Sequence, residues 1–191
     1  MWDDVAGILI KAAYWLLVPT ALLRFYMQWL RVPFRNSVGQ FICAMTDWIV
    51  LPLRRVIKGR LGLDWASLIV ALILELALAL LFDALTGRLG SYASAYVVSR
   101  WLFLGLFGLL ATGLTMMLWL TIACALMSWF RLDSAAVDVL DAITAPWLKP
   151  IRRRLPLAGG FDLSPLVLLV LLQIALVLLA RLQFYALLAL R

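Results

Sequence analysis

Four long apolar segments decide what this chain can fold into. About 18 or more consecutive, largely apolar residues suffice for a helix that crosses the roughly 30 Å hydrocarbon core of a bilayer. Such segments occupy about residues 6–30, 65–85, 97–129 and 165–190. Only 14% of the residues are charged, against about 25% in soluble domains. The sequence therefore predicts an all-α polytopic membrane protein with four transmembrane helices in a single membrane domain, 1–191.

A repeated motif divides this domain into two halves. The motif Pro52-Leu-Arg54-Arg55 with Gly62 and Asp64 returns 98 positions later as Pro150-Ile-Arg152-Arg153 with Gly160 and Asp162. Repetition at a fixed spacing indicates an internal duplication. We expect repeat 1 over 1–95 and repeat 2 over 96–191, each with two spans joined by a basic elbow, at 31–64 and 131–164. Two spans return the chain to its starting side, so both repeats should have the same orientation.

The distribution of Lys and Arg predicts which side the elbows face. The elbows 31–64 and 131–164 hold six and five of them, against two in the middle connection, 86–100. The positive-inside rule then places both elbows in the cytoplasm and both termini outside it. Asp3 and Asp4 stand where a signal peptide carries basic residues, so the first segment is expected to remain in the protein.

Each elbow also contains a segment with helical periodicity. Apolar residues recur at helical spacing in 38–49 and in 134–148. Both segments are expected to form short amphipathic helices at the membrane–water boundary, either packed on the spans or in contact with lipid. Proline is expected to end these helices, at Pro52 in the first elbow and at Pro146 and Pro150 in the second.

The arginines of the elbows are candidate binding residues. They are Arg54, Arg55, Arg152, Arg153 and Arg154. Arginine suits a phospholipid phosphate or an acidic partner. The alternative is that these residues only set the topology and pair with Asp64 or Asp162. Despite a net charge of +7, no nucleic acid is predicted, because a duplex needs a large solvated basic surface.

The second elbow has the fuller set of turn and capping residues. Gly159 and Gly160 permit a tight turn. Ser164 and Pro165 are typical of the N-cap and first position of a helix, here the fourth span. Asp162 would lie near the positive end of that helix. The first elbow keeps only Gly62 and Asp64 of this set.

Two charged residues fall inside the predicted spans. Arg24 and Glu75 each lie about 10–16 Å of helix from the cytoplasmic side. A charge at the centre of a membrane helix costs about 2.5–3.5 kcal/mol on insertion scales. We therefore hypothesise an Arg24–Glu75 ion pair, either structural or part of a polar pathway. The corresponding residues of repeat 2, Cys124 and Gln173, would form a neutral couple.

Two signatures together resemble the YggT family of bacterial and chloroplast membrane proteins. The first is Asn36-Ser-Val-Gly-Gln40-Phe41 with Thr46-Asp47 and Pro52-Leu-Arg54-Arg55, and the second is Ala145-Pro146-Trp-Leu-Lys-Pro150-Ile-Arg152 continued by Gly159-Gly160-Phe-Asp162-Leu-Ser164-Pro165. The resemblance implies a four-span protein of the bacterial inner membrane with a duplicated module and no established enzymatic activity. It also implies links with osmotic tolerance, with envelope and division processes and, in plastids, with nucleoid organisation and cytochrome assembly.

Two functions from different classes follow. The leading one is a non-enzymatic membrane organiser or assembly factor whose elbows engage anionic lipid or a protein partner. A homo-oligomer is a separate alternative, with small residues of the third span such as Gly108 and Thr112 as its face. The alternative is an ion or osmolyte pathway, with Arg24, Glu75, Gln173 and Gln183 along a polar seam. An enzyme is not expected, because the chain has no histidine and no cluster of catalytic carboxylates. Neither a metal nor another cofactor is predicted.

Overall fold

The structure, a computed structural model, describes residues 2–57, 63–85, 94–129, 135–154 and 162–189. Six helices occupy most of these ranges. They are α1 (Trp2–Trp29), α2 (Ser37–Val56), α3 (Trp65–Leu85), α4 (Ser94–Trp129), α5 (Ala135–Arg152) and α6 (Ser164–Ala189). The prediction of an all-α protein is confirmed.

Three of these helices are long and apolar enough to cross a bilayer. Within the described ranges they are Gly7–Trp29 in α1, Ser99–Ser128 in α4 and Ser164–Leu188 in α6. The apolar part of α3, Trp65–Leu81, is shorter. Its 17 residues span about 26 Å at 1.5 Å per residue. Helix α3 as a whole has 21 residues, Trp65–Leu85, or about 32 Å by the same rise, and the crossing of the membrane by this second predicted span stays a prediction.

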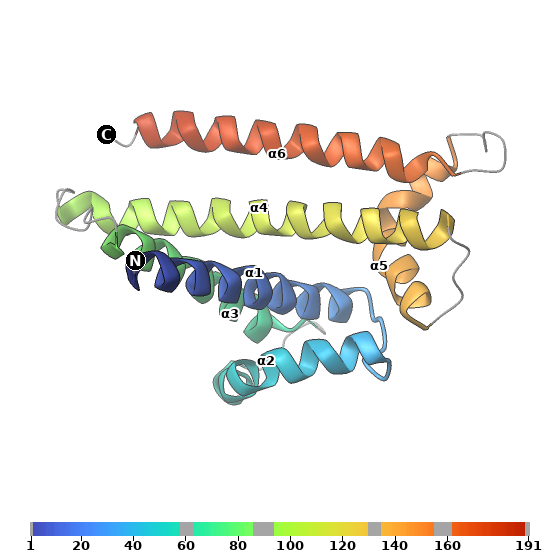
Figure 1. Ribbon diagram of the computed structural model, residues 1–191, viewed down its shortest axis with the longest axis horizontal. Coiled ribbons are helices and arrows are strands. Elements are labelled where there is room, and N and C mark those ends of the chain that lie inside the picture. The colour runs from blue at the N-terminus through green and yellow to red at the C-terminus, as the bar shows by residue number, and fades with distance from the viewer. Residues whose placement is uncertain (1, 58–62, 86–93, 130–134, 155–161, 190–191) are drawn as a thin grey trace.

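The four apolar helices form one bundle in which the repeats have the same orientation. Figure 1 shows α1 and α4 running in one direction and α3 and α6 running in the other. Helix α3 packs against both α1 and α4, and α6 packs against α4 and α5. Each repeat is thus an antiparallel pair of long helices, and α4 joins the two pairs.

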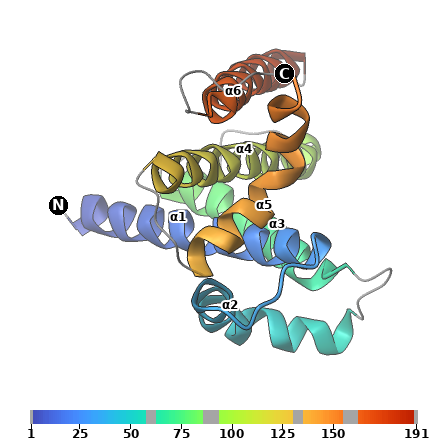
Figure 2. The ribbon, with the colours of Figure 1, turned by 90° about the vertical axis from the view of Figure 1, so that its right-hand side faces the viewer.

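The elbow helix α5 lies at the end of the bundle where α4 ends, and α2 begins near that end and runs back beside the second half of α1 (Figures 1 and 2). The prediction that proline ends them is wrong. Helix α2 continues through Pro52, and α5 continues through Pro146 and Pro150. All three prolines are exposed, so the backbone hydrogen bonds that they remove lie on exposed faces. As a result, Arg54, Arg55 and Arg152 belong to last helical turns, where the helix dipole favours cations.

A left-handed residue turns the chain from α1 toward α2. Arg31 has φ 57°. Its N–H donates to the carbonyl of Gln28 at 3.1 Å, and the Val32 N–H donates to the carbonyl of Met27 at 2.9 Å. This is the Schellman arrangement, which usually has glycine at the left-handed position. Val32 and Met27 are buried in one hydrophobic cluster, so packing holds the turn without glycine.

The chain then turns into α2, and the geometry of this turn requires Asn36 and Gly39 of the first signature. The Asn36 side chain caps α2 by accepting from the Gly39 N–H at 2.7 Å. A Cβ placed on Gly39 would lie 2.6 Å from the Phe34 Cα, closer than packed atoms approach. Only glycine therefore allows α2 to begin so near the preceding turn.

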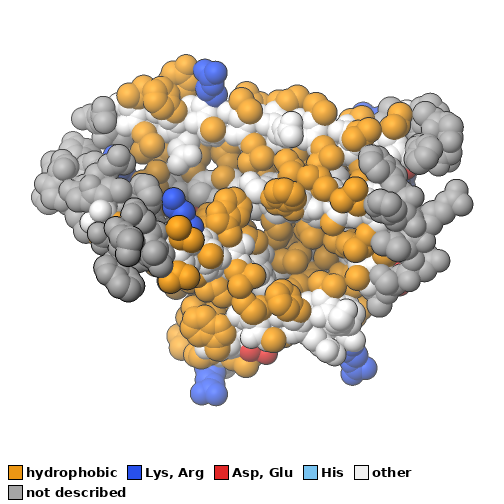
Figure 3. Space-filling view, in the orientation of Figure 1, with side chains coloured by type: hydrophobic (Ala, Val, Ile, Leu, Met, Phe, Trp, Pro, Cys, Tyr) orange, Lys and Arg blue, Asp and Glu red, His pale blue; other side chains and the backbone are white. Residues whose placement is uncertain are grey.

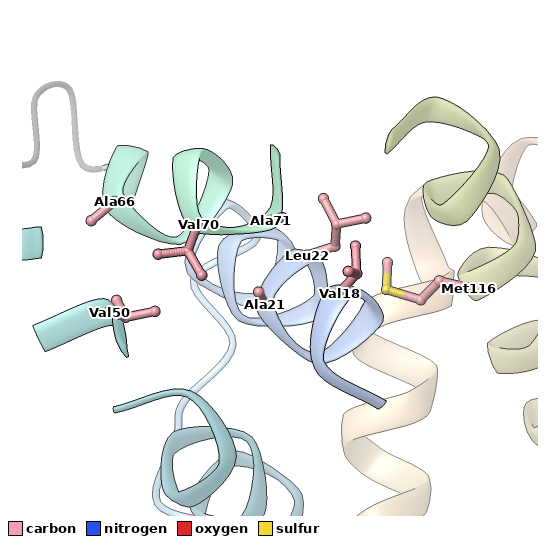
Figure 4. Packing of buried hydrophobic residues seen from close by; sticks show 8 residues of the cluster. All are labelled: Val18, Ala21, Leu22, Val50, Ala66, Val70, Ala71 and Met116. Atoms are coloured by element: carbon pink, nitrogen blue, oxygen red, sulfur yellow. The ribbon is translucent and has the colours of Figure 1, made fainter. Parts of the chain in front are cut away.

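The hydrophobic core follows the duplication. One cluster joins α1, α2, α3 and α4 and contains Val18, Ala21, Leu22, Val50, Ala66, Val70, Ala71 and Met116 (Figure 4). Another cluster joins α4, α5 and α6. Its Leu148 and Leu168 stand 98 positions after Val50 and Val70 of the first cluster, so the two repeats bury corresponding residues.

Candidate functional site

Arg24 is the centre of a buried polar network at the elbow end of repeat 1. Its side chain is 4% exposed. Nη1 donates to Thr46 Oγ1 and to Asp47 Oδ1, both at 2.7 Å. Nε lies 3.6 Å from Asp64 Oδ2. The guanidinium therefore bridges α1, α2 and the residue that precedes α3.

Asp64 connects this network to the elbow arginine Arg54. The Arg54 Nε donates to Asp64 Oδ1 at 3.1 Å, and its Nη2 donates to the other oxygen. Ser67 Oγ donates to Asp64 Oδ2 at 2.6 Å, and the Ser67 N–H donates to Asp64 Oδ1 at 3.4 Å, so Asp64 also caps α3. Burial favours the neutral acid, but the hydrogen bonds from Arg54 and Ser67 outweigh it and hold the pKa of Asp64 below its ordinary value. The hydrogen bond from Arg54 to Asp64 raises the pKa of Arg54.

The predicted Arg24–Glu75 ion pair is wrong. Arg24 is held by Asp47 and Asp64, whereas Glu75 lies in a separate cluster between α1, α3 and α4. Glu75 Oε1 accepts from Tyr14 Oη at 2.9 Å and from Thr112 Oγ1 at 2.7 Å. The error arose because position along a helix does not fix the direction in which a side chain points.

Helix α4 has glycines where α3 packs against it. A Cβ on Gly108 would lie 2.8 Å from Glu75 Oε2, and one on Gly105 would lie 2.6 Å from Leu76 Cδ2 and 3.6 Å from Leu72 Cδ1. Small residues allow membrane helices to approach closely. This contact, with the Glu75 cluster beside it, holds repeat 1 against repeat 2.

The second elbow repeats the arginine–aspartate pair in a more exposed form. Arg152 Nε donates to Asp162 Oδ2 at 2.6 Å, and the two side chains are 40% and 20% exposed. Helix α6 begins at Ser164, one residue earlier than predicted, and the capping acceptor is Asp162, which accepts from the Ser164 N–H at 2.9 Å. Burial raises the pKa of Asp162, but the hydrogen bonds with Ser164 and Arg152 lower it by more. The pKa therefore lies below its ordinary value. Gly62, Gly159 and Gly160 lie outside the described residues.

A neutral polar group replaces the buried arginine in repeat 2. Cys124 corresponds to Arg24, and its Sγ donates to Asp141 Oδ1 at 3.2 Å. Thr144, 98 positions after Thr46, donates to the Cys124 Sγ at 3.5 Å. The predicted Cys124–Gln173 couple is wrong, since Gln173 is exposed on α6.

The exposed elbow arginines are the remaining candidate binding residues. Arg55, Arg153 and Arg154 are exposed. Among the described residues, the ion pairs of the elbow arginines are formed by Arg54 and Arg152. The positive charge of each elbow is thus only partly neutralised within the protein.

Sequence reasoning missed the partners of the buried charges. Thr46 and Asp47 were noticed only as part of a signature, although Thr46 and Thr144 recur at the spacing of the duplication. Tyr14 and Thr112 gave no signal, because isolated hydroxyl groups are common in membrane helices. In the part of the chain that the structure describes, no three His, Cys, Asp or Glu side chains gather as metal ligands would.

Comparison with known proteins gives the family. The family model described as CCB3/YggT matches residues 4–85 and 103–183, one match in each repeat. A protein of Escherichia coli (strain K12) described as "Uncharacterized protein YggT" is 38% identical over 155 residues, which are 80% of this chain and 77% of that protein. A Vibrio alginolyticus protein, "Uncharacterized protein in proC 3'region", is 33% identical over 168 residues, 87% of this chain and 89% of its own length. No solved structure matches. The two matched repeats and these relatives establish that the chain belongs to the CCB3/YggT family.

Proposed function

We propose that the protein is a non-enzymatic organiser or assembly factor of the bacterial inner membrane, whose elbows engage anionic lipid at the cytoplasmic face. One observation carries this proposal. Helix α5 lies at the end of the bundle where α4 ends, α2 runs back from near that end beside α1, and both helices combine exposed arginines with exposed aromatic side chains. The processes implied by the family resemblance, osmotic tolerance and envelope and division processes, are its proposed setting.

The exposed apolar side chains of the elbow helices support contact with a membrane surface. On α2, Phe41 is 55% and Trp48 63% exposed, and on α5 Trp147 is 49% exposed. Tryptophan is enriched at membrane–water interfaces, where its ring meets both apolar and polar surroundings. Figure 3 shows apolar side chains over the left part of the lower edge of the molecule and polar or backbone atoms over the right part, with acidic atoms between them and basic side chains projecting from both parts. Such a surface suits the boundary between acyl chains and headgroups.

The arginines that form no ion pair with another described residue support a preference for anionic lipid. Each Lys or Arg close to an anionic leaflet contributes about 1 kcal/mol to attraction, within a Debye length of the surface. Arg55, Arg153 and Arg154 are exposed at the elbow end. The proposed orientation therefore puts this end in the cytoplasm and both termini outside. A C-terminal phosphatase reporter, active only outside the cytoplasm, tests the orientation, and an inactive phosphatase paired with an active cytoplasmic reporter would reverse it.

Lipid retention by the purified full-length protein tests the function. The protein is reconstituted from an equimolar mixture of phosphatidylglycerol and phosphatidylcholine, and the lipids kept after detergent extraction are measured. Retained lipid should be enriched in phosphatidylglycerol, and Arg55→Gln/Arg153→Gln should abolish the enrichment. The matched control Lys11→Gln/Arg181→Gln removes the same charge from exposed positions of α1 and α6 and should keep it. Equal enrichment in both double variants would show that the elbow arginines do not select the lipid. A protein partner would then be the better candidate for what the elbows bind.

The pathway alternative has weaker support. Arg24 is neutralised by Asp47 and Asp64, Glu75 is enclosed with Tyr14 and Thr112, and Gln173 is exposed on α6. Arg24, Glu75 and Gln173 were expected to line one polar seam, but each lies in a different part of the structure. Ion currents that Glu75→Gln abolishes would nevertheless favour a pathway over an organiser.

A further inference from the structure

An apolar cavity of about 320 Å³ lies between the first elbow helix and the helix that follows it. Its lining residues are Ile49, Pro52, Leu53 and Val56 of α2 and Val70 and Ile73 of α3. The four α2 residues are spaced as one face of a helix. No polar side chain belongs to this lining, so the cavity suits a hydrocarbon ligand.

The cavity opens to the surroundings of the protein. Val70 is 2% exposed and lies at its buried side, whereas Val56 is 80% and Ile73 49% exposed. In the orientation of the proposed function, α2 lies at the membrane boundary and α3 enters the membrane, which puts the opening where the acyl chains of a leaflet begin. Hydrocarbon can therefore reach the cavity without crossing water.

Charge at the end of α2 indicates which lipid fits. Arg54 is neutralised by Asp64, and the nearby acid Asp47 is paired with Arg24. Arg55 follows the lining residue Pro52 by three positions, so the two are neighbours on the surface of α2, and Arg55 is exposed. Its guanidinium complements a phosphate group, and the sequence continues with two more basic residues at 58 and 60. A zwitterionic headgroup carries its own cation and complements this charge less well.

We propose that this cavity, an open groove between α2 and α3, binds one acyl chain of an anionic phospholipid whose phosphate is held by Arg55. The site rests on the proposed function, because it requires the elbow end to lie in the headgroup region. It goes beyond that function, which requires only that the elbow surface prefer anionic lipid. The site assigns one bound lipid molecule to repeat 1.

Repeat 2 provides an internal comparison. The position of Ile49 is taken there by Trp147, whose Nε1 donates to Tyr26 Oη at 2.8 Å. The position of Val56 is taken by the exposed Arg154. A large indole and a charge thus replace two of the lining residues. The groove-forming face of α2 is therefore not repeated on α5, and one lipid per chain is expected.

Native mass spectrometry of the full-length protein in detergent tests the site. Phosphatidylglycerol or phosphatidylcholine with identical acyl chains is titrated in. The first phosphatidylglycerol should bind about tenfold more tightly than the first phosphatidylcholine. Ile73→Trp fills the groove and should weaken binding of this first lipid about tenfold. Leu171→Trp, at the corresponding exposed position of α6, is the matched control and should not change it.

The headgroup contact and the fold have their own controls. Arg55→Gln should lower the affinity for phosphatidylglycerol more than that for phosphatidylcholine, whose phosphate is accompanied by a cation, and Arg153→Gln in repeat 2 should leave binding of the first lipid unchanged. If circular dichroism shows that Ile73→Trp does not fold, Val56→Asn makes the exposed rim polar with little effect on the core. Wild-type binding in the folded groove variants, or equal binding of the two lipids, overturns the site. If the groove variants bind normally while Arg55→Gln/Arg153→Gln still loses its anionic enrichment, the site fails and the proposed function stands.

Discussion

The two elbow aspartates should differ sharply in their contribution to stability. Asp64 is 2% exposed as a side chain, accepts from Arg54 and Ser67, and lies 3.6 Å from the buried Arg24. Asp64→Asn would leave the two arginines opposite a single carboxylate, that of Asp47. Removing one partner of a buried ion pair costs about 3–5 kcal/mol. Because the Arg54 side chain is 38% exposed and screened by solvent, we expect the low end, about 3 kcal/mol.

Asp162→Asn is the matched change in repeat 2. Its partner Arg152 is 40% exposed, and exposed pairs contribute only about 0.2–1 kcal/mol. Loss of the charge that caps α6 adds a further few tenths, since asparagine still caps a helix. The expected cost is about 1 kcal/mol, so the two variants should differ by about 2 kcal/mol.

Reversible unfolding in mixed micelles, followed by tryptophan fluorescence and circular dichroism, measures both free energies. Arg24→Met should restore part of the loss in the Asp64→Asn background, because it removes the more deeply buried of the two arginines that then share the Asp47 carboxylate. An Asp162→Asn effect as large as that of Asp64→Asn would refute the reasoning. A double variant no more stable than Asp64→Asn alone would show that Arg24 is not the charge that Asp64 compensates.

Three further outcomes are expected from the same unfolding measurement. Arg31→Gly should stabilise by about 1 kcal/mol, because glycine adopts positive φ without strain, and Arg31→Ala, which loses the same charge, should not. Gly39→Ala should destabilise by about 1–3 kcal/mol through collision with the Phe34 backbone, while Gly113→Ala, with nothing within 4 Å of its Cβ, should be neutral. Since the pKa of Asp64 is lowered by folding, its contribution is complete above the ordinary aspartate value of about 3.9 and is lost as the pH falls through the lower folded value. Wild-type stability should therefore decrease with acid in that range, and the decrease should be smaller in Asp64→Asn.

The helices and their order could be predicted because hydropathy and periodicity are local properties. The duplication then required the two repeats to have one orientation, and the directions of α1, α3, α4 and α6 agree with it. Proline was misjudged because its effect depends on burial. Pro52, Pro146 and Pro150 all occupy exposed faces, where a lost backbone hydrogen bond can be replaced from outside the helix.

The partners of the buried charges could not be predicted from the sequence. Arg24 meets Thr46 and Asp47 because α2 folds back beside α1, and that path depends on the turn at Arg31. The Glu75 cluster requires α4 of the other repeat, which supplies Thr112 and the space beside Gly108. The Arg54–Asp64 pair could be predicted, as the alternative to ligand binding by Arg54. The repeated motif contains both residues, only ten positions apart.

The contact between α3 and α4 has a consequence for how the duplicated unit is assembled. At the α3–α4 contact, repeat 1 packs against repeat 2 through Leu72, Glu75 and Leu76 on α3, beside further contacts of α1 and α2 with α4 and α5. The corresponding residues on α6, 98 positions later, are Val170, Gln173 and Ile174, and all three are exposed. The repeats are therefore joined head to tail, like neighbouring members of a row, and not face to face like the halves of a twofold pair. A face-to-face pair would cover both copies of the joining surface, whereas this arrangement covers one copy and presents the other along the outer edge of the molecule.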